Sequence, residues 1–173
     1  MIFGPSGASK TTLSLNLIAN GAESISDDLV PLVGANAQAI SMPFAIGVKH
    51  GSFKLGKSLS PEFDKLDRVR LGQRIVKYVT PDHENVRLRK GPQSIDWVIM
   101  PKYSPYEPPE ICELSPLEAL TSAAEVGSWF SANVENMPHL AKFFERTRTV
   151  TMRYRSSNEA LGLVRNLVKT PTN

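Results

Sequence analysis

The feature that most restricts how this chain can fold lies at its start, where residues 4–11 read GPSGASKT. This segment matches the pattern G-x-x-x-x-G-K-[ST], except that Ser9 replaces the glycine before Lys10. Loops of this pattern connect a strand to a helix, and their backbone N–H groups converge on phosphate oxygens. Ile2 and Phe3 form an apolar stub before the loop, and helical apolar periodicity follows to about Asn20. The sequence therefore predicts strand, phosphate-binding loop and helix in succession.

The residues of this segment, whose turn at positions 4–9 we call the glycine loop, have distinct predicted roles. Lys10 places a positive charge at the outer phosphates, and the hydroxyl of Thr11 ligates Mg²⁺. The helix that begins near Lys10 directs its N-terminal dipole to the same place. Ser9 is an exception, because a side chain there clashes or requires a strained backbone. The predicted nucleotide-binding residues are Gly4, Pro5, Ser6, Gly7, Ala8, Ser9, Lys10, Thr11 and Thr12. A simple glycine turn before an ordinary helix is the alternative.

Asp27 and Asp28, here called the acidic pair, form the second candidate element, sixteen residues after Thr11. They stand in the apolar segment 24–33, which we expect to form a buried strand that ends or kinks at the two carboxylates and lies beside the one that leads into the glycine loop. Two carboxylates in an apolar strand are costly unless a cation compensates them. In phosphoryl transfer one acidic residue holds Mg²⁺ and another accepts the proton of the attacking hydroxyl. Taken alone such a pair is more often a turn or a helix cap, but its position favours the catalytic roles.

The rest of the chain predicts further strands and helices, and hence a mixed α/β fold. Strands are expected at residues 37–44, 74–79, 85–89, 94–100 and 149–155. Pro101 is expected to end the fourth of these, because proline lacks a backbone donor. Helices are expected to begin after the capping residue Ser115, near Met137, and after Ser156. Residues 47–91 otherwise favour loops. We find no repeat and no linker, so one domain spanning residues 1–173 is predicted, shortened before the glycine loop.

Composition restricts the classes of function that remain. Of 173 residues, 41% are hydrophobic and 21% charged, which is typical of a folded protein. Basic residues exceed acidic ones by only three and are scattered, so nucleic-acid binding is disfavoured. A membrane-spanning helix needs an apolar run of about 20 residues, and none is present. The single cysteine excludes an internal disulfide, which suits a reducing cytoplasm. We therefore expect a cytoplasmic protein with no membrane partner.

Three segments in this order resemble one known family. They read GPSGASKTTLSLNLIANG, SISDDLVPL and MPFAIGVKHGS, and they cover the chain to about residue 52, with a weaker echo in WVIMPKYSPYEP and ELSPLEAL. The order resembles the kinase domain of the HPr kinase and phosphorylase family, and more closely the HPr-kinase-related proteins found near peptide-modifying systems. The resemblance implies a mixed sheet flanked by helices, similar to phosphoenolpyruvate carboxykinase.

The resemblance also implies roles for individual residues. Lys10 and Thr11 would hold the phosphates of ATP and the Mg²⁺ ion. Asp27 would be the general base for a serine hydroxyl, and Asp28 a metal ligand. The implied activity is transfer of the γ-phosphate to a serine of a peptide or protein acceptor. The glycine before Lys10 and the Ile-Arg-Gly segment of the bifunctional enzymes are missing, so phosphorolysis is not predicted.

Two other functions remain open from the sequence. Ser9 and the short start are compatible with a non-catalytic nucleotide-binding or scaffold protein. A kinase acting on a small hydroxylated metabolite would differ only in its acceptor pocket, which the sequence does not define. The sequence also leaves open whether the chain forms a homo-oligomer.

Overall fold

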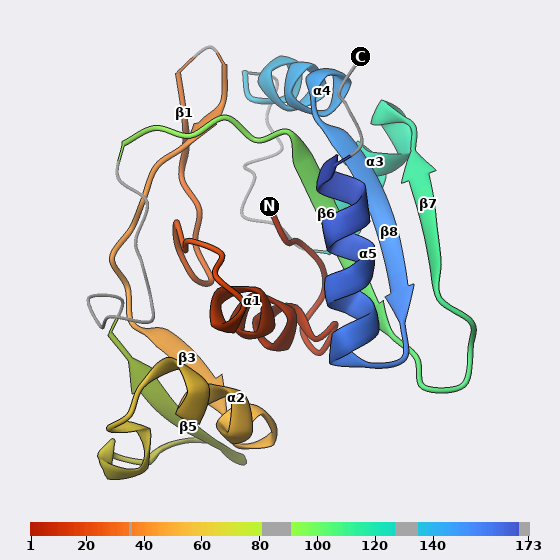
Figure 1. Ribbon diagram of the computed structural model, residues 1–173. Coiled ribbons are helices and arrows are strands. Elements are labelled where there is room, and N and C mark those ends of the chain that lie inside the picture. The colour runs from red at the N-terminus through yellow and green to blue at the C-terminus, as the bar shows by residue number, and fades with distance from the viewer. Residues whose placement is uncertain (35, 81–90, 127–134, 170–173) are drawn as a thin grey trace. The chain divides into compact units, whose positions relative to one another are not determined.

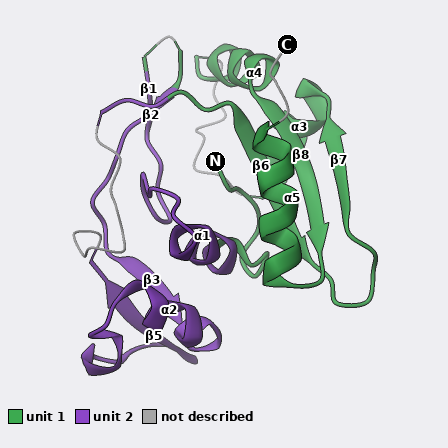
Figure 2. Ribbon diagram, viewed as in Figure 1, with its two compact units in different colours: residues 1–10, 34–37, 94–173 green, residues 11–33, 38–93 purple. Residues whose placement is uncertain are grey.

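The fold is mixed α/β, with three small sheets and five α-helices in the part of the chain that is described. The computed structural model describes residues 1–34, 36–80, 91–126 and 135–169. The chain divides into two compact units whose segments alternate along the sequence (Figure 2). Unit 1 comprises residues 1–10, 34–37 and 94–173, and unit 2 comprises residues 11–33 and 38–93. The single domain stays a prediction, since two units can still fold as one.

Unit 1 is organised around a sheet in the order β6-β8-β7 (Figure 1). The central strand β8 (Arg148–Tyr154) is parallel to β6 (Trp97–Tyr103) and antiparallel to β7 (Glu110–Leu114). The start of the chain pairs with the other edge of β6, where Ile2 forms a parallel bridge with Ile99. The Phe3 amide donates to the Ile99 carbonyl at 2.9 Å, and the Ile99 amide to the Met1 carbonyl at 2.8 Å. The predicted stub before the glycine loop is confirmed.

The prediction that Pro101 ends its strand is wrong, because β6 continues to Tyr103. The backbone groups of Ile99 point toward the start of the chain, and those of Pro101, two residues on, point to the same edge. The chain has already turned into the glycine loop there, and a Cβ on Gly4 would lie 3.9 Å from Pro101 Cδ. Proline is tolerated where its missing donor faces an unpaired edge. Pro101 therefore keeps its place opposite Met152 of β8.

The described residues of unit 1 include three helices, which begin where the sequence predicts them: α3 (Pro116–Glu125), α4 (Met137–Arg146) and α5 (Ser157–Lys169). Before α3 the Ser115 hydroxyl accepts from the Glu118 amide, and the Glu118 carboxylate accepts from the Ser115 amide, which completes the capping box. Figure 1 shows α5 lying along the sheet of unit 1. Its buried residues Leu161, Val164 and Leu167 form the predicted apolar face.

Unit 2 contains most of α1 (Lys10–Ala19), the small pair β1 (Leu32–Val33) and β2 (Gln38–Ala39), and a sheet in the order β3-β5-β4. The strands of this sheet are β3 (Ile46–Lys49), β5 (Arg74–Val79) and β4 (Val69–Leu71), all antiparallel. Between β3 and β4 run the 3₁₀ turn η1 (His50–Ser52), the helix α2 (Phe53–Leu59) and the 3₁₀ turn η2 (Phe63–Lys65).

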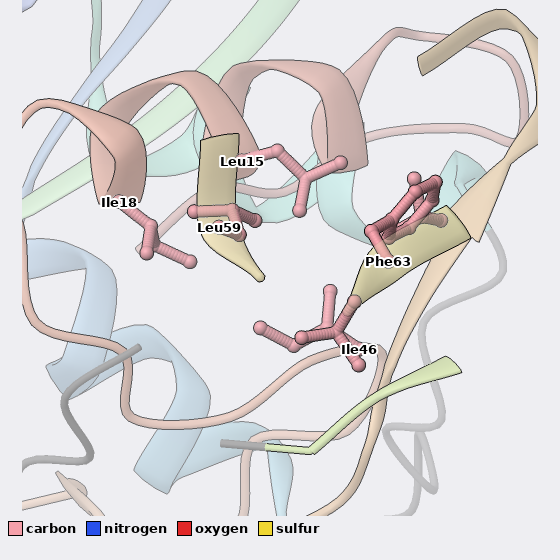
Figure 3. Close-up of a cluster of buried hydrophobic side chains, with 7 residues drawn as sticks. Leu15, Ile18, Ile46, Leu59 and Phe63 are labelled. Carbon is pink, nitrogen blue, oxygen red and sulfur yellow. The ribbon is translucent and has the colours of Figure 1, made fainter. Parts of the chain in front are cut away.

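Side chains from α1, α2, η2 and the β3-β5 sheet form the core of unit 2 (Figure 3). The cluster consists of Leu15, Ile18, Ile46, Val48, Leu59, Phe63 and Val79. The Phe63 ring lies directly against Gly56 of α2, where an added Cβ would come within 2.3 Å of Cε2. Lys77 of β5 is buried beside this core, and its ammonium donates to the carbonyls of Phe63 at 2.8 Å and Asp64 at 2.9 Å. Gly56 and Lys77 thus have structural roles in unit 2.

Several predictions for this half of the chain need correction. The expected strand at 24–33 is reduced to β1, and the one at 37–44 to β2. The segment predicted as mostly loop contains β3, α2 and β4. The pairing partner of β3 is distant in sequence, whereas β4 pairs with β5 across a short turn that was not predicted. The predicted strand at 74–79 is confirmed as β5, whereas the one at 85–89 lies outside the described residues. Among the helices that are described, none combines the length and apolarity needed to cross a membrane.

Candidate functional site

The glycine loop adopts a backbone in which three residues have positive φ. Gly4 has φ 153°, Gly7 has φ 90°, and Ser9 has φ 61°. A side chain in the left-handed region costs about 1 to 2 kcal/mol, which glycine avoids. The prediction that Ser9 needs a strained backbone is therefore confirmed. Ser9 adopts the left-handed conformation at the position where the general pattern has glycine, and so the turn of the loop is kept despite the substitution.

Internal hydrogen bonds close the glycine loop on itself. The Ala8 amide donates to the Pro5 carbonyl at 3.2 Å, and Lys10 Nζ donates to the same carbonyl at 2.8 Å. Lys10 is the first residue of α1, so its ammonium and the positive end of the helix dipole lie at the same turn. Pro5, Ser6 and Gly7 are exposed to solvent. A loop of this form can present N–H groups and one cation to an anion.

The boundary between the units falls just inside α1, so Gly4 to Lys10 belong to unit 1 and Thr11 and Thr12 to unit 2. The Thr12 hydroxyl is 2.9 Å from the Ser52 hydroxyl of η1, and this contact ties the start of α1 to the sheet of unit 2. Thr11 is half-buried. Thr11 thus remains the hydroxyl that the motif assigns to a metal ion, while Thr12 has a structural contact.

The acidic pair lies in unit 2, in a bend, as expected for a segment that ends or kinks at two carboxylates, although the strand expected around it is reduced to β1. The Gly47 amide of β3 donates to Asp27 Oδ2 at 3.1 Å. Asp28 has φ 38°, so the chain turns sharply between the two carboxylates and the following Leu29, whose amide donates to the Asp27 carbonyl. Asp27 is half-buried, whereas Asp28 is exposed. The two acids therefore experience different environments, although they are adjacent.

The electrostatics of Asp27 suit a proton acceptor. Burial raises the pKa of this carboxyl above its ordinary range, and the negative charge of Asp28 acts in the same direction. The Gly47 amide and the more distant Lys49 ammonium lower the pKa, but they do not overcome burial. A base with a raised pKa binds a proton more readily, which favours general base catalysis.

No group of three His, Cys, Asp or Glu side chains within the described ranges is arranged to hold a metal ion. Mg²⁺ does not require such a group, because it usually keeps several waters and uses one or two carboxylates together with substrate phosphates. The acidic pair and Thr11 are oxygen donors of the kind it prefers. Thr11 and the acidic pair are therefore candidate ligands by residue type.

One residue beside the glycine loop was not identified from the sequence. Tyr154, the last residue of β8, lies next to the Ser9 hydroxyl, which acts on its pKa. In the sequence it is only one of three apolar residues that alternate along a strand, and nothing there distinguishes it from the buried Val150 and Met152. Its place near the loop follows from the parallel pairing of β6 with β8.

Comparisons with known protein families, with curated proteins and with solved structures found no match to this chain. The glycine loop and Lys10 lie together in unit 1, and the acidic pair lies in unit 2 with Thr11 and Thr12.

Proposed function

We propose that this chain is an ATP- and Mg²⁺-dependent kinase that transfers the γ-phosphate to a serine hydroxyl of a peptide or protein. The observation that carries the proposal is the glycine loop itself. It has positive φ at Gly4, Gly7 and Ser9, follows a stub paired in parallel with β6, and leads directly into α1 at Lys10. This strand, loop and helix arrangement is the context in which the sequence pattern binds phosphate.

In the proposed mechanism Lys10 leaves the Pro5 carbonyl and contacts the outer phosphates of ATP. Thr11 and Asp28 would provide oxygen ligands to a Mg²⁺ ion bound with the nucleotide, and such an ion would supply positive charge to the transferring group. Asp27 accepts the proton of the serine hydroxyl as its oxygen attacks the γ-phosphorus and the bond to the β-phosphate oxygen breaks. The raised pKa of Asp27 supports this last role.

The resemblance to HPr kinases supports serine as the acceptor and a fold of the phosphoenolpyruvate carboxykinase type. A second candidate is a nucleotide-binding scaffold without transfer activity. It is favoured by Ser9, which places a side chain and its left-handed strain where the usual pattern has glycine. Both candidates require ATP to bind at the glycine loop, and they differ in turnover.

The proposal is tested first by calorimetry with ATP and Mg²⁺, and then by transfer of labelled γ-phosphate to a library of serine-containing peptides. Asp27→Asn should lower transfer by about 100-fold or more, because a general base contributes about 10² to 10⁴ in rate. Its affinity for ATP should change little, since Asp27 is not proposed to contact the phosphates.

Asp67→Asn is a matched control, since Asp67 is an exposed acid of the same unit and has no proposed role. Lys10→Ala should instead weaken ATP binding. If the Asp27→Asn variant transferred phosphate at the native rate, the assignment of Asp27 as general base would be wrong. ATP binding by the native chain without any turnover would select the scaffold, and absence of ATP binding would reject both candidates.

A further inference from the structure

The Tyr154 hydroxyl is a buried polar group without a partner. Tyr154 is only 4% exposed, and within the described part of the chain its Oη makes no hydrogen bond of acceptable geometry. Tyrosine hydroxyls usually find a partner when they are buried, and an unsatisfied one costs about 1 to 3 kcal/mol. Such a group next to a candidate binding loop indicates a missing acceptor.

The hydroxyl is placed at the glycine loop by the sheet of unit 1. Tyr154 pairs with Tyr103 at the carboxyl ends of the parallel strands β8 and β6, where the two rings lie 5.9 Å apart. Gly4 lies over Pro101 at the same end of β6. The Ser9 hydroxyl lies next to the phenol, and Ser9 immediately precedes the first residue of α1. The unpartnered hydroxyl therefore lies beside the residue that immediately precedes this helix.

The chemistry around Tyr154 indicates which kind of ligand could accept a hydrogen bond from its hydroxyl. Burial raises the pKa of Tyr154, an effect that the neighbouring Ser9 hydroxyl opposes. The phenol thus keeps its proton at neutral pH and remains a donor. Helix N-termini and left-handed loops also present donors, so a ligand shared by all of them must be an acceptor with negative charge. A phosphoryl group offers oxygens of this kind to several donors at once.

We propose that Tyr154 is a phosphate-binding residue, whose hydroxyl donates to a phosphoryl oxygen of the nucleotide at the start of α1. This inference rests on the proposed nucleotide site and adds a contact from β8, which the glycine loop motif does not include. It also gives Ser9 a role. Its hydroxyl lies beside the Tyr154 phenol, so Ser9 is the loop residue next to the proposed phosphate contact.

The test compares Tyr154→Phe with the native chain by calorimetry, using ATP with Mg²⁺ and then inorganic pyrophosphate with Mg²⁺. Loss of a hydrogen bond to a charged group should weaken binding of both probes by about 10- to 100-fold. The melting temperature of the unliganded variant should be unchanged or higher, because the removed hydroxyl has no partner to lose. Tyr103→Phe, on the adjacent strand and 51% exposed, is the control and should bind both probes as the native chain does.

The outcomes separate this inference from the proposed function. If the native chain binds ATP and Tyr154→Phe binds it equally well, the inference is wrong and the nucleotide site stands. If the variant loses melting temperature along with affinity, the hydroxyl has a structural role and the inference is also wrong. If the native chain binds neither probe, the nucleotide site fails and the inference fails with it.

Discussion

The two units hold their parts of the predicted site by different means. In unit 1 the glycine loop is fixed by backbone pairing, since the stub before it is bonded to Ile99 and the residue after it begins α1. In unit 2 the acidic pair lies in a bend, and one backbone donor, the Gly47 amide, holds the Asp27 carboxylate. Gly47 belongs to β3, so the position of Asp27 depends on the β3-β5 sheet and on its core. The position of the acidic pair therefore depends on tertiary packing more than that of the glycine loop does.

The largest effect is expected when the Phe63 ring is removed from the core of unit 2, on which the position of Asp27 depends. Phe63→Ala should destabilise unit 2 by about 3 to 5 kcal/mol, because the ring is almost fully buried and its loss leaves a cavity. Hydrogen exchange should then show lost protection in β3 and β5, with smaller changes in β6 and β8. Phe143→Ala, at the equally buried Phe143 of α4, is the matched variant of unit 1 and should show the opposite pattern. Equal loss of protection in all strands for both variants would mean that the units unfold together.

A smaller effect is expected from alanine substitutions at two helical glycines, one in each unit. Gly56→Ala in α2 should destabilise the chain by about 1 to 3 kcal/mol, since the new methyl group would overlap the Phe63 ring. Gly162→Ala in α5 meets no atom within 4 Å and should stabilise it by about 0.5 to 1 kcal/mol through helix propensity. Chemical denaturation measures both changes. A neutral Gly56→Ala would show that the core of unit 2 repacks freely.

The same contrast explains what could be predicted from the sequence. Features coded by neighbouring residues were found, among them the glycine loop, the cap at Ser115 and the alternation in β8. The predicted strand ended too early, before Pro101. Only the pairing of Ile99 with Met1 and Phe3 shows which edge of the sheet the proline faces. Most of unit 2 was missed for a similar reason. Nothing local shows that Gly56 makes room for a ring, or that Lys77 is buried against two carbonyls.

In the site, residue types were more predictable than their surroundings. The glycine pattern indicated Lys10 and the positive φ of Ser9, because both follow from the turn itself. The kink at the acidic pair was predicted and agrees with the left-handed Asp28, but the strand suggested by the apolar neighbours on both sides is reduced to β1. Tyr154 had no local signal, because its proximity to Ser9 depends on a strand that lies more than a hundred residues away.

The smallest expected effect concerns the pH dependence of stability, and it tests whether the environment of Asp27 is costly. Its pKa is raised by burial above the ordinary value of 3.8, so the folded state binds its proton more tightly than the unfolded state does. The group therefore favours folding most at low pH, and this contribution is lost as the pH rises through the folded pKa. Asp27→Asn removes the titration while its amide oxygen can still accept from the Gly47 amide. Relative to the native chain, the variant should become progressively more stable between about pH 4 and about pH 7, as measured by chemical denaturation. If the difference in free energy of unfolding between the variant and the native chain did not change with pH, or changed in the opposite direction, Asp27 would be as well solvated as an exposed acid. Its environment would then give no support to the role of general base.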